Sequence, residues 1–137
     1  NTDHVRTIVD SGLDTMRVSL FSAQEDNYNR YYRPRNYSLT DVERSIAYSV
    51  EQGVYVSLNL LAFPGFTDRK TEIEALLGLI HRTGLQKVQL RNLNIDCDYF
   101  YETLELEKEP SLGMEVLIHR LEENGVVVGN YSRPKNI

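Results

Sequence analysis

Polar side chains alternate with apolar ones in three short segments of this chain. The polar positions are filled by Arg17, Ser19, Ser57, Asn59, Gln89 and Arg91. Val or Leu occupies the positions between them. Successive side chains of a β-strand point to opposite faces, so each segment predicts a strand with one apolar and one polar face. A strand that helices cover on both faces is almost wholly Val, Ile and Leu. The sequence therefore predicts helices on one face only and a wet, polar surface on the other.

The polar face offers groups that recognise a polar organic molecule. Arg17 and Arg91 are costly to desolvate without partners, and guanidinium groups suit carboxylates and phosphates. Hydroxyl and amide groups can bind a sugar hydroxyl or the edge of a nucleobase. Such groups are supplied by Ser19, Asn59, Gln89 and Asn92. Gly65 follows the second strand in a Pro-Gly turn and allows close approach of a flat ligand. These residues predict a binding site but name no reaction.

Other chemistries find little support in the residues. His4, His81 and His119 lie far apart in the sequence and are interpreted as surface or packed residues rather than metal ligands. Cys97 is the single cysteine, which excludes an internal disulfide framework. The sequence contains no G-x-S-x-G, G-x-G-x-x-G or Walker A motif,. The Tyr- and Arg-rich segment 28–37 is interpreted as a structured loop with solvated arginines rather than a nucleic-acid contact.

Length and charge set further limits. The chain has 137 residues and a net charge of -5, so we expect one domain over 1–137 and no nucleic-acid partner. No apolar run approaches the roughly 18 residues of a membrane span, and no signal-peptide pattern is visible. We expect no membrane partner, and a reducing cytoplasm is the simplest compartment.

Helices are predicted to alternate with the strands. They are expected over residues 3–11, 22–32, 41–52, 68–83, 99–104 and 114–124, with a fourth strand over 126–130. Ser22 is predicted as an N-cap, and Thr40 with Glu43 as a capping box. The turn 62–65 follows the second strand. This order predicts an α/β fold, a partial (half) βα barrel of parallel strands with helices on the outer face. A complete barrel needs about 200 residues or more, and the chain begins at Asn1 without Met, so we expect a fragment.

The chain resembles the radical S-adenosylmethionine superfamily in three stretches. Residues 12–23 (GLDTMRVSLFSA) resemble the fourth barrel strand of that family, with Tyr31-Tyr32-Arg33-Pro34 and Tyr37-Ser38 after it. Residues 60–68 (LLAFPGFTD) resemble the fifth strand and its turn, and residues 88–96 (VQLRNLNID) the sixth. No single motif is diagnostic, but their order and spacing match the family. The resemblance covers about residues 3–98.

The resemblance implies a cofactor site at the carboxyl ends of the strands. Members bind a 4Fe-4S cluster through C-x3-C-x2-C and cleave S-adenosylmethionine to start radical chemistry on a substrate. The resemblance implies candidate cofactor-binding residues, which are Ser19, Ser22, Arg33, Phe63, Gly65, Arg91 and Asn92. Asn59 is added to them from the polar face. Arg30 is an alternative to Arg33. Because the chain has one cysteine, the three cluster ligands are expected outside it, and the fragment alone is predicted to be inactive.

The sequence leaves open the substrate, the partners and two alternative functions. The intact protein would need a reductant for the cluster, and its substrate is a small molecule, a peptide or a protein, as in a glycyl-radical activating enzyme. A half barrel leaves an exposed sheet edge, so we expect a homodimer or another contact along that edge. One alternative is a non-catalytic α/β ligand-binding or regulatory module. Another is a piece of a different βα-barrel enzyme that acts on phosphorylated substrates.

Overall fold

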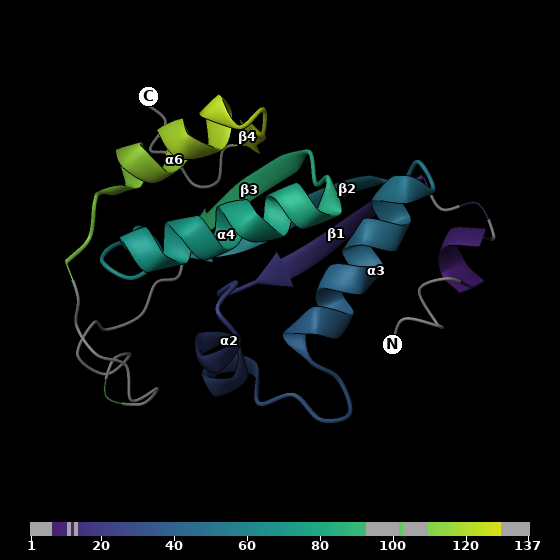
Figure 1. Cartoon of the computed structure of the whole chain (residues 1–137), viewed down its shortest axis with the longest axis horizontal. Coiled ribbons are helices and arrows are strands. Elements are labelled where there is room, and N and C mark those ends of the chain that lie inside the picture. The colour runs from purple at the N-terminus through teal and green to yellow at the C-terminus, as the bar shows by residue number, and fades with distance from the viewer. Residues whose placement is uncertain (1–6, 11, 13, 93–101, 103–109, 130–137) are drawn as a thin grey trace.

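The computed structural model describes residues 7–10, 12, 14–92, 102 and 110–129. Strands and helices alternate along the chain (Figure 1). The elements are β1 (Thr15–Leu20), α2 (Glu25–Tyr32), α3 (Leu39–Glu51), β2 (Tyr55–Ala62), α4 (Lys70–Thr83), β3 (Lys87–Asn92), α6 (Met114–Glu123) and β4 (Val127–Gly129). Residues 7–10 are also helical. The four predicted strands are therefore present.

The strands form one sheet in the order β1-β2-β3-β4, and every pair is parallel. Each strand lies beside the next one in the chain, and each connection contains at least one helix. The register places Ser19 opposite Asn59 and Asn59 opposite Gln89. This arrangement confirms the predicted α/β fold of parallel strands with outer helices, consistent with part of a βα barrel.

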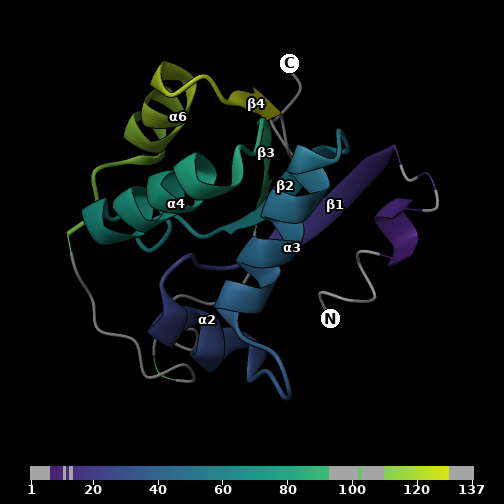
Figure 2. The same ribbon diagram turned by 45° about the vertical axis from the view of Figure 1, so that its right-hand side comes forward.

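The helices lie on one face of the sheet, and the core lies between the two layers. Figures 1 and 2 show α3, α4 and α6 on the same side of the strands. On β2, Val56, Leu58 and Leu60 are at most 2% exposed, and they alternate with the polar positions. The helix predicted over 68–83 is present as α4, and its apolar residues at helical spacing are buried. These are Ile73, Leu76, Leu77 and Ile80.

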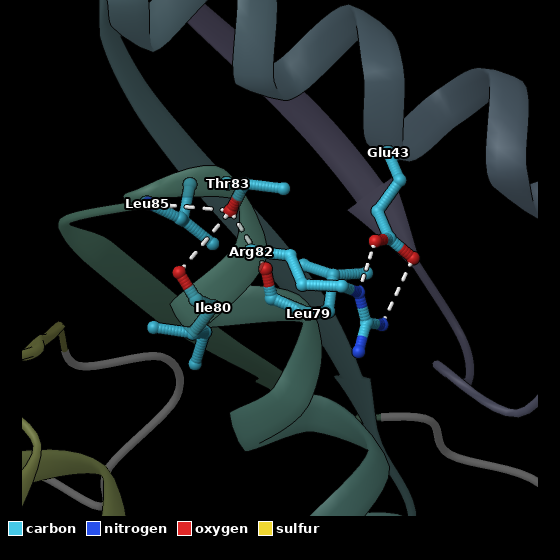
Figure 3. A network of polar contacts seen from close by, with 6 residues as sticks. All are labelled: Glu43, Leu79, Ile80, Arg82, Thr83 and Leu85. Atoms are coloured by element: carbon cyan, nitrogen blue, oxygen red, sulfur yellow. Dashed lines mark hydrogen bonds and ion pairs between the residues drawn. The ribbon is translucent and has the colours of Figure 1, made fainter.

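Polar contacts fix the end of α4 and its position against α3 (Figure 3). The Thr83 hydroxyl donates to the Leu79 carbonyl at 2.9 Å and accepts from the Leu85 backbone N–H at 3.2 Å. The Arg82 guanidinium binds the Glu43 carboxylate with two nitrogens, the Nη2 contact being 3.1 Å long. Gly84 follows with a φ of 76° and closes the helix,.

Two predicted helix starts are wrong. Ser38, not Thr40, caps α3, and its capping box uses Asp41 instead of Glu43. The two boxes lie two residues apart in the sequence, and the earlier start brings Leu39, 5% exposed, into the core. Ser22 lies before α2 and is not its N-cap, because that position falls to Gln24. The short helix expected over 99–104 falls almost wholly outside the described residues.

The sheet edge at β1 carries no further strand in the described part of the chain, where β1 pairs with β2 alone. A pocket of about 290 Å³ lies along this edge, between β1 and α3, and is lined by Met16, Val18 and Val42 among others. Across the described residues, no helix combines the length and apolar character needed to cross a membrane.

Candidate functional site

The face of the sheet opposite the helices is polar and consists of rows that cross the strands. One row joins Ser19 on β1, Asn59 on β2 and Gln89 on β3 through the strand register. A second row lies two residues nearer the amino ends and joins Arg17, Ser57 and Lys87. Because side chains alternate with period two, both rows project from the same face. The polar face inferred from the alternation is therefore a surface of aligned side chains from three strands.

Among the residues that the structure describes, two side-chain atoms on this face are buried without a hydrogen-bond partner. They are the Ser57 hydroxyl oxygen and the Asn59 amide oxygen, which come from alternate residues of β2. The Ser57 residue is 8% exposed, and Asn59 is half-buried. An unsatisfied buried polar group costs about 1–3 kcal/mol, and native proteins hold few of them. Both atoms thus have unused hydrogen-bonding capacity.

Ser22 stands apart from these rows because its hydroxyl is engaged elsewhere. It lies in the loop after β1, is 1% exposed, and donates to the Glu72 carboxylate of α4 at 2.8 and 2.9 Å. The side-chain amide of Asn27 also donates to this carboxylate, at 2.9 Å, and the Gln24 amide contacts the same oxygen. Glu72 therefore ties the loop after β1, and the start of α2, to the start of α4.

Glu72 is the buried acid of this region. Burial raises the pKa of its carboxyl above the ordinary value, and the hydrogen bonds from Ser22, Asn27 and Gln24 oppose that rise without cancelling it. The nearby positive charge of Arg69 also lowers the pKa. Glu72 is 4% exposed and Arg69 is 3% exposed. These opposite charges therefore lie together in a shielded region beside the carboxyl ends of β1 and β2.

The turn after β2 is held by its own polar groups. The Phe63 backbone N–H donates to the Thr67 hydroxyl at 2.8 Å, and the Gly65 N–H donates to the Asp68 carboxylate at 2.8 Å. The Gly65 carbonyl accepts from Arg69 Nε at 3.2 Å. Gly65 has a φ of 95°, a conformation that favours glycine. The glycine at this position is thus required by the turn itself, whatever ligand approaches it.

Stacked aromatic rings pack the same end of the sheet. The Tyr31 and Phe21 ring centres lie 4.4 Å apart, and those of Phe21 and Phe66 lie 4.8 Å apart. The Arg69 guanidinium lies 4.9 Å from the centre of the Phe66 ring, within the range of a cation–π contact. Phe63 belongs to this aromatic cluster and is 4% exposed. The stacked rings thus pack together beside the carboxyl ends of β1 and β2.

The structure brings some predicted site residues together and separates others. Ser19 is exposed beside Asn59, and Arg91 is exposed near the end of β3 on the same face. Arg33 is exposed at the end of α2 with a φ of 47°. The backbone of Asn92 pairs with Ala62 at the end of β3. The structure thus groups Ser19, Asn59 and Arg91, while Ser22, Phe63 and Gly65 also have structural roles at the carboxyl end.

A metal site is not found among the described residues, where no three His, Cys, Asp or Glu side chains gather to hold an ion. Cys97, the single cysteine, lies outside the described residues. One thiolate cannot supply the three cluster ligands of a C-x3-C-x2-C motif. The residues of this chain therefore do not fit a 4Fe-4S cluster.

A parallel sheet with one layer of helices and a polar open face defines the chain as an α/β domain of the partial-barrel class. Among solved structures it is similar to a domain of pyruvate-formate lyase-activating enzyme from Bacteroides vulgatus ATCC 8482, with a TM-score of 0.66. The alignment covers 95% of this chain and 74% of that chain, at 9% sequence identity. No protein-family model and no curated protein sequence matches the chain. At this identity the likeness shows a shared fold.

Sequence reasoning missed Glu72 and Arg69. Both belong to the start of α4, where an acidic residue ordinarily faces water near the positive end of the helix dipole. Their burial depends on the loop after β1 folding over them, a long-range contact that helical spacing does not encode. The sequence holds one weak signal for a buried acid. Ser22, Gln24 and Asn27 are hydrogen-bond donors close together in the chain, with no Lys or Arg among them.

Proposed function

We propose that this chain is the S-adenosylmethionine-binding half of a radical S-adenosylmethionine enzyme, in which the open polar face forms part of the barrel lumen. The observation that carries the proposal is the row of Ser19 and Asn59 with the unpartnered amide oxygen of Asn59. The likeness of the fold to an activating-enzyme domain supports it, and so do the three strand segments that resemble the superfamily.

The chemistry of the Asn59 row suits a ribose. An amide oxygen is an acceptor, and a hydroxyl both donates and accepts, so a vicinal diol can donate to Asn59 and exchange a hydrogen bond with Ser19. Adjacent strands lie about 4.8 Å apart, which places the two side chains within reach of neighbouring ring hydroxyls. Asn59 Oδ1 then gains the partner that it lacks in the chain alone.

The carboxyl end of the sheet provides the remaining contacts of the proposed site. The Phe63–Gly65 turn offers a close backbone for the adenine at Gly65, and the buried Phe63 ring supports this turn. Arg91 offers a cation for the carboxylate of the methionine part, and Arg33 and Asn92 extend the set on neighbouring elements. Ser22 contributes indirectly to the proposed site. Its hydrogen bonds to Glu72 hold the loop after β1 at this end of the sheet.

The role of this chain in the reaction is to bind and orient the cofactor. The cluster, with ligands outside the chain, supplies the electron that cleaves S-adenosylmethionine when both are bound. The residues of the open face hold the ribose and exclude water from it. The intact protein is proposed to act in the cytoplasm on a small-molecule, peptide or protein substrate and to receive its electron from a separate reductant.

The uncovered edge of β1 is consistent with this assignment, because a barrel continues at that point with another parallel strand. In the described chain the pocket of about 290 Å³ along β1 leaves room beside Met16 and Val18. An unpaired edge tends to recruit another strand. A homodimer of the 137-residue chain through this edge remains a prediction.

Calorimetric titration of the reconstituted full-length protein with S-adenosylmethionine tests the proposal. The pair Ser19→Ala and Asn59→Ala should weaken binding by about 5- to 150-fold, because two hydrogen bonds together contribute about 1–3 kcal/mol and about 1.4 kcal/mol corresponds to tenfold. Iron and sulfide content should stay at the wild-type level.

A matched pair of substitutions provides the control. Thr71→Ala and Gln86→Ala remove a hydroxyl and an amide from exposed positions outside the two rows, and they should leave the affinity unchanged. Equal affinity in the wild type and in the Ser19/Asn59 variant would refute the assignment of these two residues. Absence of S-adenosylmethionine binding by the wild-type protein would refute the proposed function and favour a binding module for another ligand.

A further inference from the structure

We propose that the amino-terminal half of the open face binds a phosphate group of a small ligand through Arg17, Ser57 and Lys87. These residues occupy one row across β1, β2 and β3, with Ser57 at the centre. The row lies two residues before Ser19 and Asn59, about 6.6 Å away along the strands. This site is therefore separate from the proposed ribose site and does not depend on it.

The geometry of the row brings two cations toward one hydroxyl. Ser57 is opposite Arg17 on one side and opposite Lys87 on the other. Since neighbouring strands are about 4.8 Å apart, the two basic residues begin about 10 Å from each other, and each side chain is long enough to reach a ligand bound above Ser57. A pocket of about 180 Å³ lies here, lined by residues that include Arg17, Tyr55, Ser57 and Lys87.

The charges of this pocket are not neutralised by the described part of the chain. None of the described residues that line it is acidic. Within the same residues, no carboxylate forms an ion pair with Arg17 or Lys87. Two uncompensated cations on one face attract an anion from solution, even though the whole chain has a net charge of -5.

The buried hydroxyl is a second and independent sign of a ligand. The Ser57 oxygen is buried and has no hydrogen-bond partner within the described part of the chain, and the residue is 8% exposed. A serine hydroxyl in this position can donate to an anionic oxygen. Loss of its hydrogen bonds with water on folding is offset when a ligand oxygen occupies the pocket.

Glycine at position 129 keeps Lys87 close to the sheet. A Cβ atom at residue 129 would lie 3.2 Å from Lys87 Cε and 3.6 Å from Gln89 Cγ. The aliphatic part of Lys87 therefore lies against the bare backbone of β4, and the residue is half-buried. Because β4 and β2 flank β3 on opposite sides, the Lys87 side chain must turn back across β3 for its ammonium group to reach a ligand at Ser57.

The number and kind of donors favour phosphate over carboxylate. Three donors approach from three strands: a planar guanidinium fork, a compact ammonium and a hydroxyl. A phosphate monoester has three terminal oxygens in a tetrahedral arrangement, so each donor can take its own oxygen. A carboxylate has two oxygens in one plane, which leaves one donor unused. Two positive side chains also match the charge of about -1.5 to -2 on a phosphate monoester at pH 7.

Titration of the isotopically labelled full chain with inorganic phosphate, at ionic strength held constant with chloride, tests the site. Amide chemical shifts should change in a saturable way at residues 17, 57 and 87. The double variant Arg17→Gln/Lys87→Gln should weaken binding at least tenfold. The variant Lys87→Arg keeps the charge and should retain binding within a few-fold.

The control variant Arg35→Gln/Lys70→Gln removes the same charge from exposed cations outside the pocket and should bind phosphate as the wild type does. The proposal is overturned by the absence of saturable shifts at the three residues. It is also overturned by equal weakening in the two double variants, which would indicate a general charge effect. Neither result bears on S-adenosylmethionine binding, which the Ser19 and Asn59 variants test separately.

Discussion

The two faces of the sheet differ although they belong to the same strands. On the covered face, Leu58 and its neighbours on β2 are buried under α3 and α4 and contact apolar side chains. On the open face, Ser57 and Asn59 hold buried polar atoms without partners. Adjacent residues of one strand thus have opposite environments, because alternation sends them to opposite sides.

This difference separates stability from function within a single element. The covered face gains free energy by removing apolar area from water. The open face gains nothing from its buried polar atoms, because an unsatisfied group costs about 1–3 kcal/mol. Polar residues at such positions are expected where a ligand satisfies them. Substitutions on the two faces of β2 should therefore have different effects, and three predictions sharpen this contrast.

The largest effect is expected on the covered face. Leu58 is fully buried in the central part of the core, and Leu58→Ala should lower the free energy of unfolding by about 2–5 kcal/mol because it removes packed methyl groups and leaves a cavity. Urea unfolding followed by circular dichroism measures this change. A loss below about 1 kcal/mol would mean that the core is less tightly packed than the structure shows.

A pH-dependent effect of intermediate size is expected at Glu72, which lies beside the carboxyl ends of β1 and β2. Burial raises the pKa of its carboxyl in the folded state, so the protonated form is favoured by folding. Its contribution to stability is therefore fully present below the unfolded pKa and declines as pH rises through the folded pKa. The unfolding free energy of the wild type, minus that of Glu72→Gln, should fall as the pH rises from the ordinary carboxyl pKa through the raised pKa of the folded state.

Unfolding by urea at a series of pH values, with both proteins in the same buffers, gives this difference directly. Glu74→Gln is the matched control, because Glu74 lies on the same helix at an exposed position. Its difference from the wild type should stay nearly constant with pH. A difference for Glu72→Gln that grows with pH would contradict the assigned direction of the pKa shift.

The smallest effect is expected on the open face. Ser57→Ala should leave the free energy of unfolding unchanged or raise it by up to about 1 kcal/mol, because it removes a buried hydroxyl that has no partner. Ser22→Ala is the comparison, since the Ser22 hydroxyl donates to Glu72 and its loss should cost about 1–3 kcal/mol. Equal destabilisation by the two substitutions would show that Ser57 has a structural partner.

Much of the fold was predictable from local sequence patterns. The alternation around Val18 and Leu58 and the helical spacing of Ile73 and Leu76 each depend on one element, so the strands and α4 were predicted correctly. The start of α3 was not, because Ser38 and Thr40 each begin a plausible capping box. The choice depends on the burial of Leu39, which is a tertiary contact.

The site was predictable only where the strand period determines it. Alternation placed Ser19 and Asn59 on one face, and the strand register, visible only in the structure, made them neighbours. The environment of Ser22 could not be predicted, because its partner Glu72 lies 50 residues away in the sequence. The exposed position of Arg33 at the end of α2 likewise depends on the fold of a loop, for which the sequence carries no period. Arg91 lies on the polar face, as the alternation predicts.

The most direct measurement is the sequence of the natural gene upstream of the codon for Asn1. If the open face is half of a radical S-adenosylmethionine site, the reading frame encodes C-x3-C-x2-C after a predicted strand, and the intact protein binds a 4Fe-4S cluster. A reading frame that lacks the three cysteines would contradict this assignment. The polar face would then serve another ligand, and the phosphate site of Arg17, Ser57 and Lys87 would be the first to examine.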